Sequence, residues 1–211
     1  MFSTLNIENF KCLTEFSQSL KPVTLLTGFN SAGKSTVIQA LALIGQTIAQ
    51  NEWAKSLYLN GSSVTLGTMY DVIDRNTGGV GFNIALGTDD WQCRWKTTST
   101  ERKREVTAQL AQIEITKGNA SWRWQKEEIS EIQLRALVPE ALSGQDPDLF
   151  KELQQALSAI RHISAERLGP REVYVAATPM IDPDPGSQGE RTALCLEEFQ
   201  DAPVNPGLIL A

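Results

Sequence analysis

The chain has 211 residues, 41% of them hydrophobic, which is enough apolar material for one large domain or one and a half small ones. Its net charge of −6, from 25 acidic and 19 basic residues, argues against a surface coated for non-specific nucleic-acid binding. The three cysteines are widely spaced, which predicts reduced thiols. The N-terminus is unlike a secretion signal, and no apolar run approaches the ~20 residues of a membrane span. We therefore expect a cytoplasmic protein with no membrane partner.

Three short strands are predicted at the start of the chain. Residues 5–10 alternate apolar and polar side chains, as in a half-buried strand, and residues 11–13 continue the pattern. Residues 16–20 predict a second strand, which Lys21-Pro22 ends. Residues 23–27 are β-branched and apolar, and this run predicts a buried strand of a parallel sheet.

A glycine-rich loop follows. Residues 28–35, Gly-Phe-Asn-Ser-Ala-Gly-Lys-Ser, fit the phosphate-binding spacing G-x-x-x-x-G-K-[ST] at every defined position. The strand predicted before the loop and the helix predicted over residues 34–50 are the neighbours that such a loop requires. The alternative is a glycine turn that begins an ordinary helix, and a chance match would not also have both neighbours in place. The sequence therefore predicts a nucleotide site.

The chemistry of this site follows from its residue types. Glycines let the backbone approach an anion closely, and the loop N–H groups and the positive end of the helix cradle the α- and β-phosphates. We expect Lys34 to reach the β- and γ-phosphates, Ser35 to hold Mg²⁺, and Thr36 to cap the helix and touch the α-phosphate. The predicted nucleotide-binding residues are Gly28, Asn30, Ser31, Ala32, Gly33, Lys34, Ser35 and Thr36, with Ser35 as the metal ligand.

The next segment predicts antiparallel β structure. A hairpin is expected from strands at residues 57–59 and 64–66 around an Asn60-Gly61 turn, followed by one helical turn at residues 69–73. A meander of strands then follows, and its members are expected around residues 82–86, 91–95, 106–115 and 122–124.

Two features of this β segment have functional alternatives. Trp91, Trp95, Trp122 and Trp124 are spaced to share strand faces, and we interpret them as core of the sheet rather than a base-stacking platform. Residues 102–104, Arg-Lys-Arg, are interpreted as a solvated run, with a phosphate or nucleic-acid contact as the minority interpretation.

The last third predicts helices and one charged turn. Residues 134–142 and 148–160 are helix-like, and Asp146-Pro147 is a good helix start. Residues 142–145, Leu-Ser-Gly-Gln, look like a shortened ABC signature, which we reject because one glycine is missing and no apolar strand ending in Asp-Glu follows. His162 is interpreted as structural. The turn at residues 163–171 is equally a ligand-facing loop or a surface salt-bridge cluster.

The opening strand, the phosphate loop and its helix resemble the first lobe of ABC/SMC-like ATPases, a group that includes RecF-like proteins and the ATPases of OLD-family nucleases. Residues 59–61, 64–68, 71–72, 163–171 and 189–190 are similar to one bacterial branch of AAA-type, AAA_21-like ATPases. Several members of that branch act in anti-phage defence beside a nuclease. The resemblance implies an α/β P-loop NTPase fold, with ATP and Mg²⁺ as cofactors. It also implies that Lys11 lies near the nucleotide and Glu166 and Arg167 near the γ-phosphate.

The resemblance divides the chain into residues 1–52 (strands, phosphate loop and helix), 53–130 (an antiparallel β insertion) and 131–211 (a helical segment and a strand-turn returning towards the nucleotide). Because no apolar strand ending in Asp-Glu and no credible signature are found, residues 1–211 resemble the N-terminal lobe of a head. The implied partners are the C-terminal lobe or a second ATPase chain, in a homo- or hetero-oligomer. A nuclease partner and nucleic acid stay open.

The expected function is ATP-dependent head association that controls a partner or nuclease, with weak nucleotide binding and poor hydrolysis by the chain alone. Its catalytic carboxylate is unknown, with Glu166 as the best candidate. Two alternatives stay open. One is a scaffold subunit whose phosphate loop is a relic and whose β insertion binds a partner protein. The other is a kinase-like phosphotransferase, which the long β insertion disfavours.

Overall fold

The structure is a computed structural model that describes residues 1–74, 76–99, 105–165, 186, 188–192, 195 and 209–210. Its elements, in chain order, are β1 (Thr4–Phe10), β2 (Leu13–Ser19), α1 (Lys34–Gln50), β3 (Ser56–Tyr58), α2 (Met69–Val72), β4 (Asn83–Gly87), β5 (Trp91–Thr98), β6 (Thr107–Lys117), β7 (Ala120–Gln125), α3 (Lys126–Glu131), β8 (Leu134–Arg135), β9 (Val138–Pro139), the 3₁₀ helix η1 (Glu140–Gly144), α4 (Pro147–Ser158), β10 (Arg161–His162) and β11 (Ile209–Leu210).

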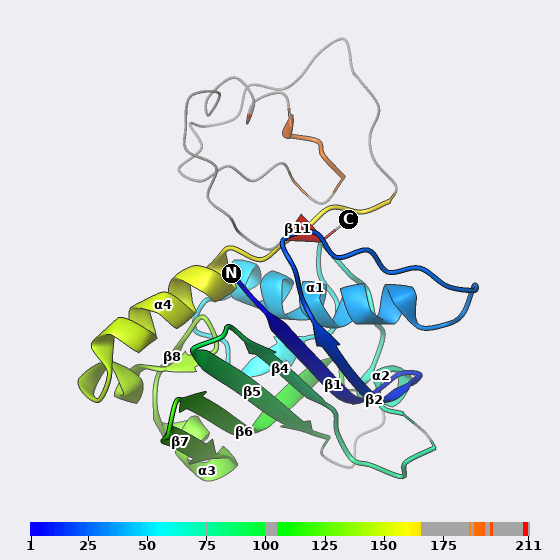
Figure 1. Cartoon of the computed structure of the whole chain (residues 1–211). Coiled ribbons are helices and arrows are strands. Elements are labelled where there is room, and N and C mark those ends of the chain that lie inside the picture. Colours follow the sequence, from blue (N-terminus) through cyan, green and yellow to red (C-terminus); the bar gives the residue numbers. More distant parts are fainter. Residues whose placement is uncertain are drawn as a thin grey trace.

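A seven-stranded antiparallel sheet is the main layer of the fold (Figure 1). Its strands run in the order β2-β1-β4-β5-β6-β3, and β7 also pairs with β6. The first half of β6 pairs with β3 and its second half with β7. The predicted meander is therefore confirmed, and it continues the sheet that β1 and β2 begin.

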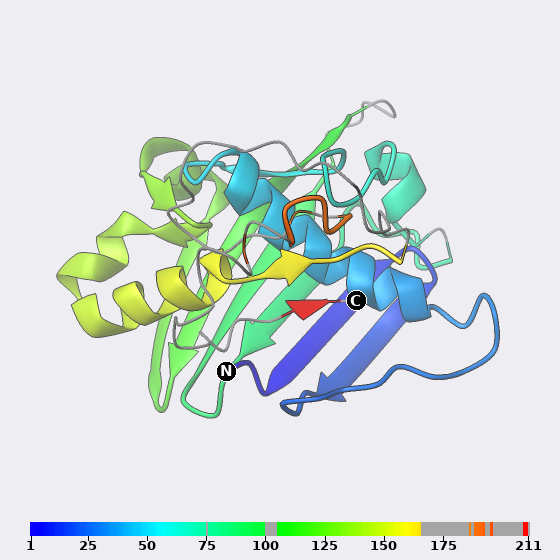
Figure 2. The ribbon, with the colours of Figure 1, turned by 90° about the horizontal axis from the view of Figure 1, so that it is seen from above.

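The two faces of this sheet differ in polarity, as an antiparallel sheet with one covered face requires. Along β5, Trp91, Cys93 and Trp95 are buried, whereas the alternating polar positions, including Arg94, are half-buried. Helices α1 and α4 lie on the buried side (Figures 1 and 2). On the opposite face, Glu8 accepts a hydrogen bond of 2.9 Å from Arg94, which lies two strands away.

Helix α1 is central to the packing. It contacts the main sheet through β1 and β3, and it also contacts α4 and the parallel pair β10-β11. Figure 1 shows it between the sheet and β11. Its buried side chains therefore lie on more than one side: Val37, Ala40, Leu41, Ala42, Leu43, Ile44 and Ile48 are all buried. None of the helices that the structure describes is long and apolar enough to cross a bilayer.

The predicted burial of the sheet tryptophans is confirmed for three of the four. Trp91, Trp95 and Trp124 expose 2%, 0% and 8% of their surface, and Trp122 is half-buried against the same core. The indole Nε1 of Trp95 donates to the Leu137 carbonyl oxygen at 3.0 Å, which satisfies its only polar group. These rings form core, so they are not a stacking platform.

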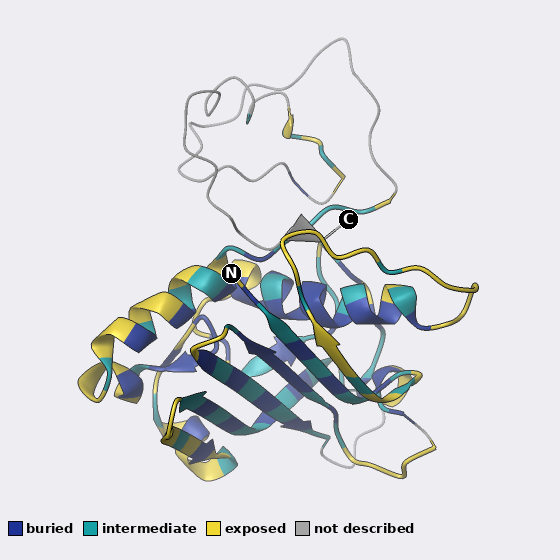
Figure 3. Cartoon of the chain, in the orientation of Figure 1, coloured by how far each residue is buried: buried dark blue, intermediate teal, exposed yellow. Residues whose placement is uncertain are grey.

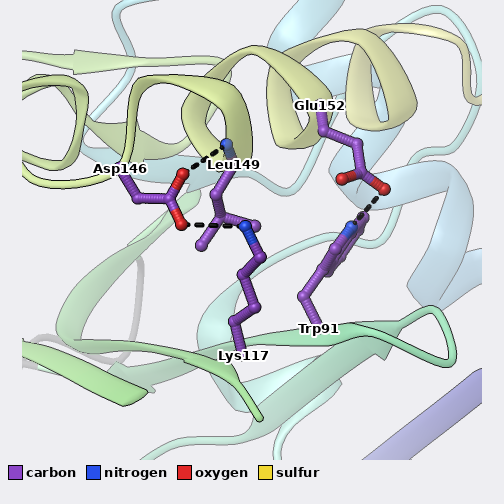
Figure 4. A network of polar contacts seen from close by, with 5 residues as sticks. All are labelled: Trp91, Lys117, Asp146, Leu149 and Glu152. Atoms are coloured by element: carbon purple, nitrogen blue, oxygen red, sulfur yellow. Dashed lines mark hydrogen bonds and ion pairs between the residues drawn. The ribbon is translucent and has the colours of Figure 1, made fainter.

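Helix α4 begins where Asp146-Pro147 predicts. The Asp146 side chain accepts from the Leu149 N–H at 2.9 Å and from Lys117 Nζ at 2.8 Å (Figure 4). Trp91 Nε1 donates to Glu152 at 2.7 Å on the same helix. The pKa of the Asp146 carboxyl is lowered, chiefly by the Lys117 hydrogen bond and then by the Leu149 N–H. These contacts attach α4 to the ends of β5 and β6.

The predicted helix at residues 134–142 is wrong. This segment is the hairpin β8-β9 followed by η1. Ala136 and Leu137 have φ angles of 50° and 62°, and together they form the tight turn between the two strands. Pro139 then cannot continue a helix. The apolar residues whose spacing predicts a helix are still buried, but they reach the core from the hairpin and η1. They include Leu134, Ala136, Leu137, Val138 and Leu142.

Two predicted turns are also displaced. Lys11 and Cys12 do not continue the first strand but connect β1 to β2, with Phe10 opposite Leu13. The predicted strand at residues 64–66 is wrong, because this segment forms only an isolated bridge from Thr65 to Asn60, and β3 pairs with β6 instead. The turn of this segment lies between Gly61 and Val64 rather than at Asn60-Gly61. The Asn60 side chain accepts from the Gly67 N–H at 2.9 Å and donates to the Gly67 carbonyl oxygen at 2.8 Å.

Candidate nucleotide-binding site

The phosphate loop has the backbone conformation that its glycines predict. Gly28 and Gly33 have φ angles of 146° and 87°, and Ser31 between them has φ 65°. Gly33 is the N-cap of α1, in the left-handed region where glycine is favoured. Helix α1 then begins at Lys34, so the loop leads directly into a helix of 17 residues.

The start of α1 presents unused hydrogen-bond donors. The first bond of the helix runs from Val37 N to Gly33 O at 3.1 Å. Within the described part of the chain, no acceptor bonds the N–H groups of residues 33–36, and no side chain caps the helix. Four free N–H groups at the positive end of a helix form a site for an anion such as phosphate.

The three side chains after Gly33 differ in environment. Lys34 Nζ donates to the carbonyl oxygens of Gly28 and Phe29, at 2.7 and 2.6 Å. Ser35 is exposed in the first turn, where its hydroxyl is accessible to a cation. Thr36 is buried inside the first turn, and its hydroxyl contacts Cys12. The predicted capping by Thr36 is therefore wrong.

The predicted buried strand at residues 23–27 is also wrong. Val23 and Leu25 expose 88% and 83% of their surface, and Phe29 in the loop exposes 90%. The segment before α1 is mostly yellow in Figure 3, and no described strand pairs with it. Thr24 instead makes a local turn with the backbone of Lys21. The sequence has β-branched and apolar residues, but a strand also needs a neighbouring backbone, which the described chain does not supply here.

The β1–β2 turn lies directly beside the phosphate loop. A Cβ placed on Gly33 would lie 3.0 Å from Leu13 Cδ2 and 3.3 Å from Cys12 Sγ. Cys12 Sγ also lies 3.6 Å from Thr36 Oγ1. No sequence pattern predicts either residue as part of the site. Their only signal is their position next to Lys11, which the resemblance had implied as a site residue.

Lys11 reaches the second turn of α1. Its Nζ donates to Gln39 Oε1 at 2.8 Å, and its backbone has φ 55°. Burial lowers the pKa of the Lys11 ammonium, and the charges of Cys12 and Asp71 oppose that shift. The structure thus places Lys11 against α1. Its partner there, Gln39, lies five positions after Lys34 along the helix.

Several predicted residues fall outside the described ones. Glu166, Arg167 and the Arg-Lys-Arg run at residues 102–104 are not described, so the structure does not place them at the site. His162 is half-buried in β10, and its buried Nδ1 has no hydrogen-bond partner among the residues that the structure describes. Its pKa is lowered by burial, as suits a packed imidazole. Among the described residues, no cluster of three His, Cys, Asp or Glu side chains forms a metal site.

Residues 1–132 match the family described as AAA ATPase domain. This match includes β1, β2, the phosphate loop, α1 and the sheet as far as β7. The chain belongs to the AAA ATPase domain family. No curated protein matches the sequence. The chain belongs to an ATPase family, and its loop has the geometry of a phosphate site. Both observations point to nucleotide binding by this AAA ATPase domain.

The residues present fit a nucleotide with Mg²⁺. The free N–H groups of residues 33–36 and the Lys34 ammonium match a phosphate chain, and the exposed Ser35 hydroxyl is an oxygen ligand of the type that Mg²⁺ prefers. Bound Mg²⁺ would neutralise charge on the phosphates. To contact them, Lys34 has to exchange its two loop carbonyls for phosphate oxygens.

Proposed function

We propose that the chain is the ATP-binding lobe of an ABC/SMC-like head, related to RecF-like proteins and the ATPases of OLD-family nucleases. The observation that carries the proposal is the left-handed Gly33 at the start of α1, where the N–H groups of residues 33–36 have no acceptor among the described residues. Lys34 supplies the positive charge for the phosphates, and Ser35 supplies a ligand for Mg²⁺. The β1–β2 turn packs against Gly33 of the loop through Leu13 and Cys12.

We propose further that ATP drives association of this lobe with a second lobe or a second ATPase chain. Supporting this, the apolar side chains next to the loop are exposed, notably Val23, Leu25 and Phe29. Solvation of such side chains is unfavourable, and a partner's strand beside residues 23–27 would cover them. ATP between the two surfaces would couple nucleotide binding to association. In a bacterial anti-phage system, that association would control a partner nuclease.

Calorimetry with ATP·Mg²⁺ on the full chain tests nucleotide binding. Lys34→Ala is expected to remove measurable binding without changing the circular dichroism, because the hydrogen bonds of Lys34 to described residues both go to carbonyls of the exposed loop. Lys151→Ala, at an exposed position on α4, is the matched control and is expected to bind as the wild type does. Unchanged affinity in Lys34→Ala would favour the scaffold alternative, in which the loop is a relic.

Sedimentation velocity tests association, with the chain alone and mixed with the product of a neighbouring gene. Leu25→Asp is expected to reduce the ATP-dependent complex, whereas Val80→Asp, a comparably exposed apolar position at 68%, is expected to leave it. Equal complexes in both variants would show that residues 23–27 are not the contact surface.

A further inference from the structure

Residues 72–74, the last residue of α2 and the two that follow it, hold the β1–β2 turn from both sides. Lys11 N donates to the Val72 carbonyl oxygen at 2.7 Å, and Asp74 N donates to the Asn9 carbonyl oxygen at 2.9 Å. Asn9 and Lys11 have φ angles of 58° and 55°, a left-handed conformation that is uncommon outside glycine, although asparagine adopts it more readily than lysine does. Residues 72–74 bond the backbone of both residues.

Asp74 is the only buried carboxylate in the described part of the chain, with 1% of its surface exposed. Its Oδ2 accepts from Thr14 Oγ1 at 2.6 Å, and its Oδ1 accepts from the Asn76 N–H at 2.9 Å. These two bonds lower the pKa of the Asp74 carboxyl, and Thr14 is the larger cause. A buried carboxylate is costly unless its hydrogen bonds are made, so Thr14 is fixed to it. Thr14 is the second residue of β2, just past the turn.

The other side of the turn contacts the phosphate loop and α1. Lys11 bonds Gln39, Cys12 contacts Thr36, and Leu13 packs on Gly33, as described above. A continuous set of hydrogen bonds and packing contacts therefore connects Asp74, through the turn, to the backbone that would bind phosphate. Contact alone is not coupling, so the connection needs a functional test.

We propose that Asp74 is a positioning residue of the phosphate loop, which acts through Thr14 and the β1–β2 turn. The proposal rests on the proposed nucleotide site, because the loop that Asp74 positions is the one assigned to ATP. In this proposal Asp74 acts without contacting the nucleotide. It fixes the turn on which Gly33 packs, and Gly33 sets the direction of the N–H groups that follow.

The first test compares two substitutions of Thr14. Thr14→Val removes the hydroxyl at constant shape and is expected to weaken ATP·Mg²⁺ binding about tenfold. Thr14→Ser keeps the hydroxyl and is expected to restore near wild-type affinity. Trp91→Phe is the control for stability, because it breaks the Trp91–Glu152 bond at the opposite end of the sheet. It is expected to lower the unfolding midpoint without changing affinity.

The second test does not use a nucleotide. Cys12 is exposed whereas Cys93 is buried, so a Cys195→Ser background makes Cys12 the reactive thiol. Its alkylation rate by a maleimide reports how firmly the turn contacts Thr36. We expect Thr14→Val to raise that rate about threefold or more, and Thr14→Ser and Trp91→Phe to leave it unchanged.

The two tests separate this inference from the proposed function. If the wild type binds no ATP, the proposed function fails, and the Cys12 rate still shows whether Asp74 positions the turn. If Thr14→Val lowers stability as Trp91→Phe does, with affinity and Cys12 rate unchanged, Asp74 is merely structural and the inference is overturned.

Discussion

Leu13 crowds the position that a Cβ on Gly33 would occupy. A Cβ on Gly33 would lie 3.0 Å from Leu13 Cδ2, which is tighter than most Cβ contacts and requires the leucine to move by a few tenths of an ångström. The φ angle of 87° at Gly33 also favours glycine, because residues with a side chain rarely adopt this backbone conformation. Glycine is therefore needed here for conformation and for packing, and the two requirements can be measured separately.

Gly33→Ala is expected to lower both stability and ATP affinity. Gly118→Ala is the matched control, since Gly118 has φ 57° but no atom within 4 Å of its Cβ position. Backbone strain alone costs about 1–2 kcal/mol in each variant. Urea unfolding should show a larger loss for Gly33→Ala, and only that variant should lose ATP binding by calorimetry. Equal losses of stability would mean that the contact with Leu13 is not tight.

Trp95→Ala is expected to lower the free energy of unfolding by about 3–5 kcal/mol. Trp95 is fully buried and its indole N–H is bonded to the Leu137 carbonyl, so truncation leaves a cavity and an unsatisfied acceptor. Trp53, which is 45% exposed and lies over the Arg135 guanidinium, is the matched control. Trp53→Ala should cost about 1 kcal/mol or less. A similar loss in both variants by urea unfolding would contradict the described core.

The bond between Thr14 and Asp74 predicts a specific dependence of stability on pH. Because folding lowers the pKa of the Asp74 carboxyl, the unfolded chain binds more protons in acid. The stabilisation is complete at neutral pH, and it is lost as the pH falls below about 4 and through the lowered pKa. Thr14→Val removes the largest cause of the shift. Its free energy of unfolding should therefore fall below that of the wild type at neutral pH, and the difference should shrink in acid. A difference that stays constant with pH would exclude the carboxylate as its source.

The sequence predicted those features whose signal is local. The glycine spacing of the phosphate loop, the alternation along β5 and the Asp146 helix start each depend on a few adjacent residues, and each is found in the structure. Strand alternation does not reveal which strands pair. That β4 pairs with β1, so that the meander continues the N-terminal sheet, is decided by long-range packing.

The failures have a common physical origin. Residues 23–27 have strand-forming side chains, but strand formation also depends on a neighbouring backbone. Residues 134–142 contain apolar positions at helical spacing. The left-handed turn at Ala136 and Leu137 prevents a helix there, and the apolar side chains reach the core from the β8-β9 hairpin and η1 instead. Cys12 and Leu13 have no recognisable motif, since their contact with Gly33 arises only from the packing of the β1–β2 turn on α1.

The last prediction concerns ATP hydrolysis by the isolated chain. Lys34 supplies charge for the phosphates and Ser35 a metal ligand, but the described side chains at the loop include no carboxylate that would position the attacking water. A positioned base contributes about 10²–10⁴-fold in rate. Phosphate release by the chain alone is therefore expected near background, and to rise when a partner lobe or chain is added. Glu166, which lies outside the described residues, is the remaining candidate. Clear turnover by the isolated chain, lost in both Lys34→Ala and Glu166→Gln but not in Lys151→Ala, would show that it carries its own catalytic carboxylate.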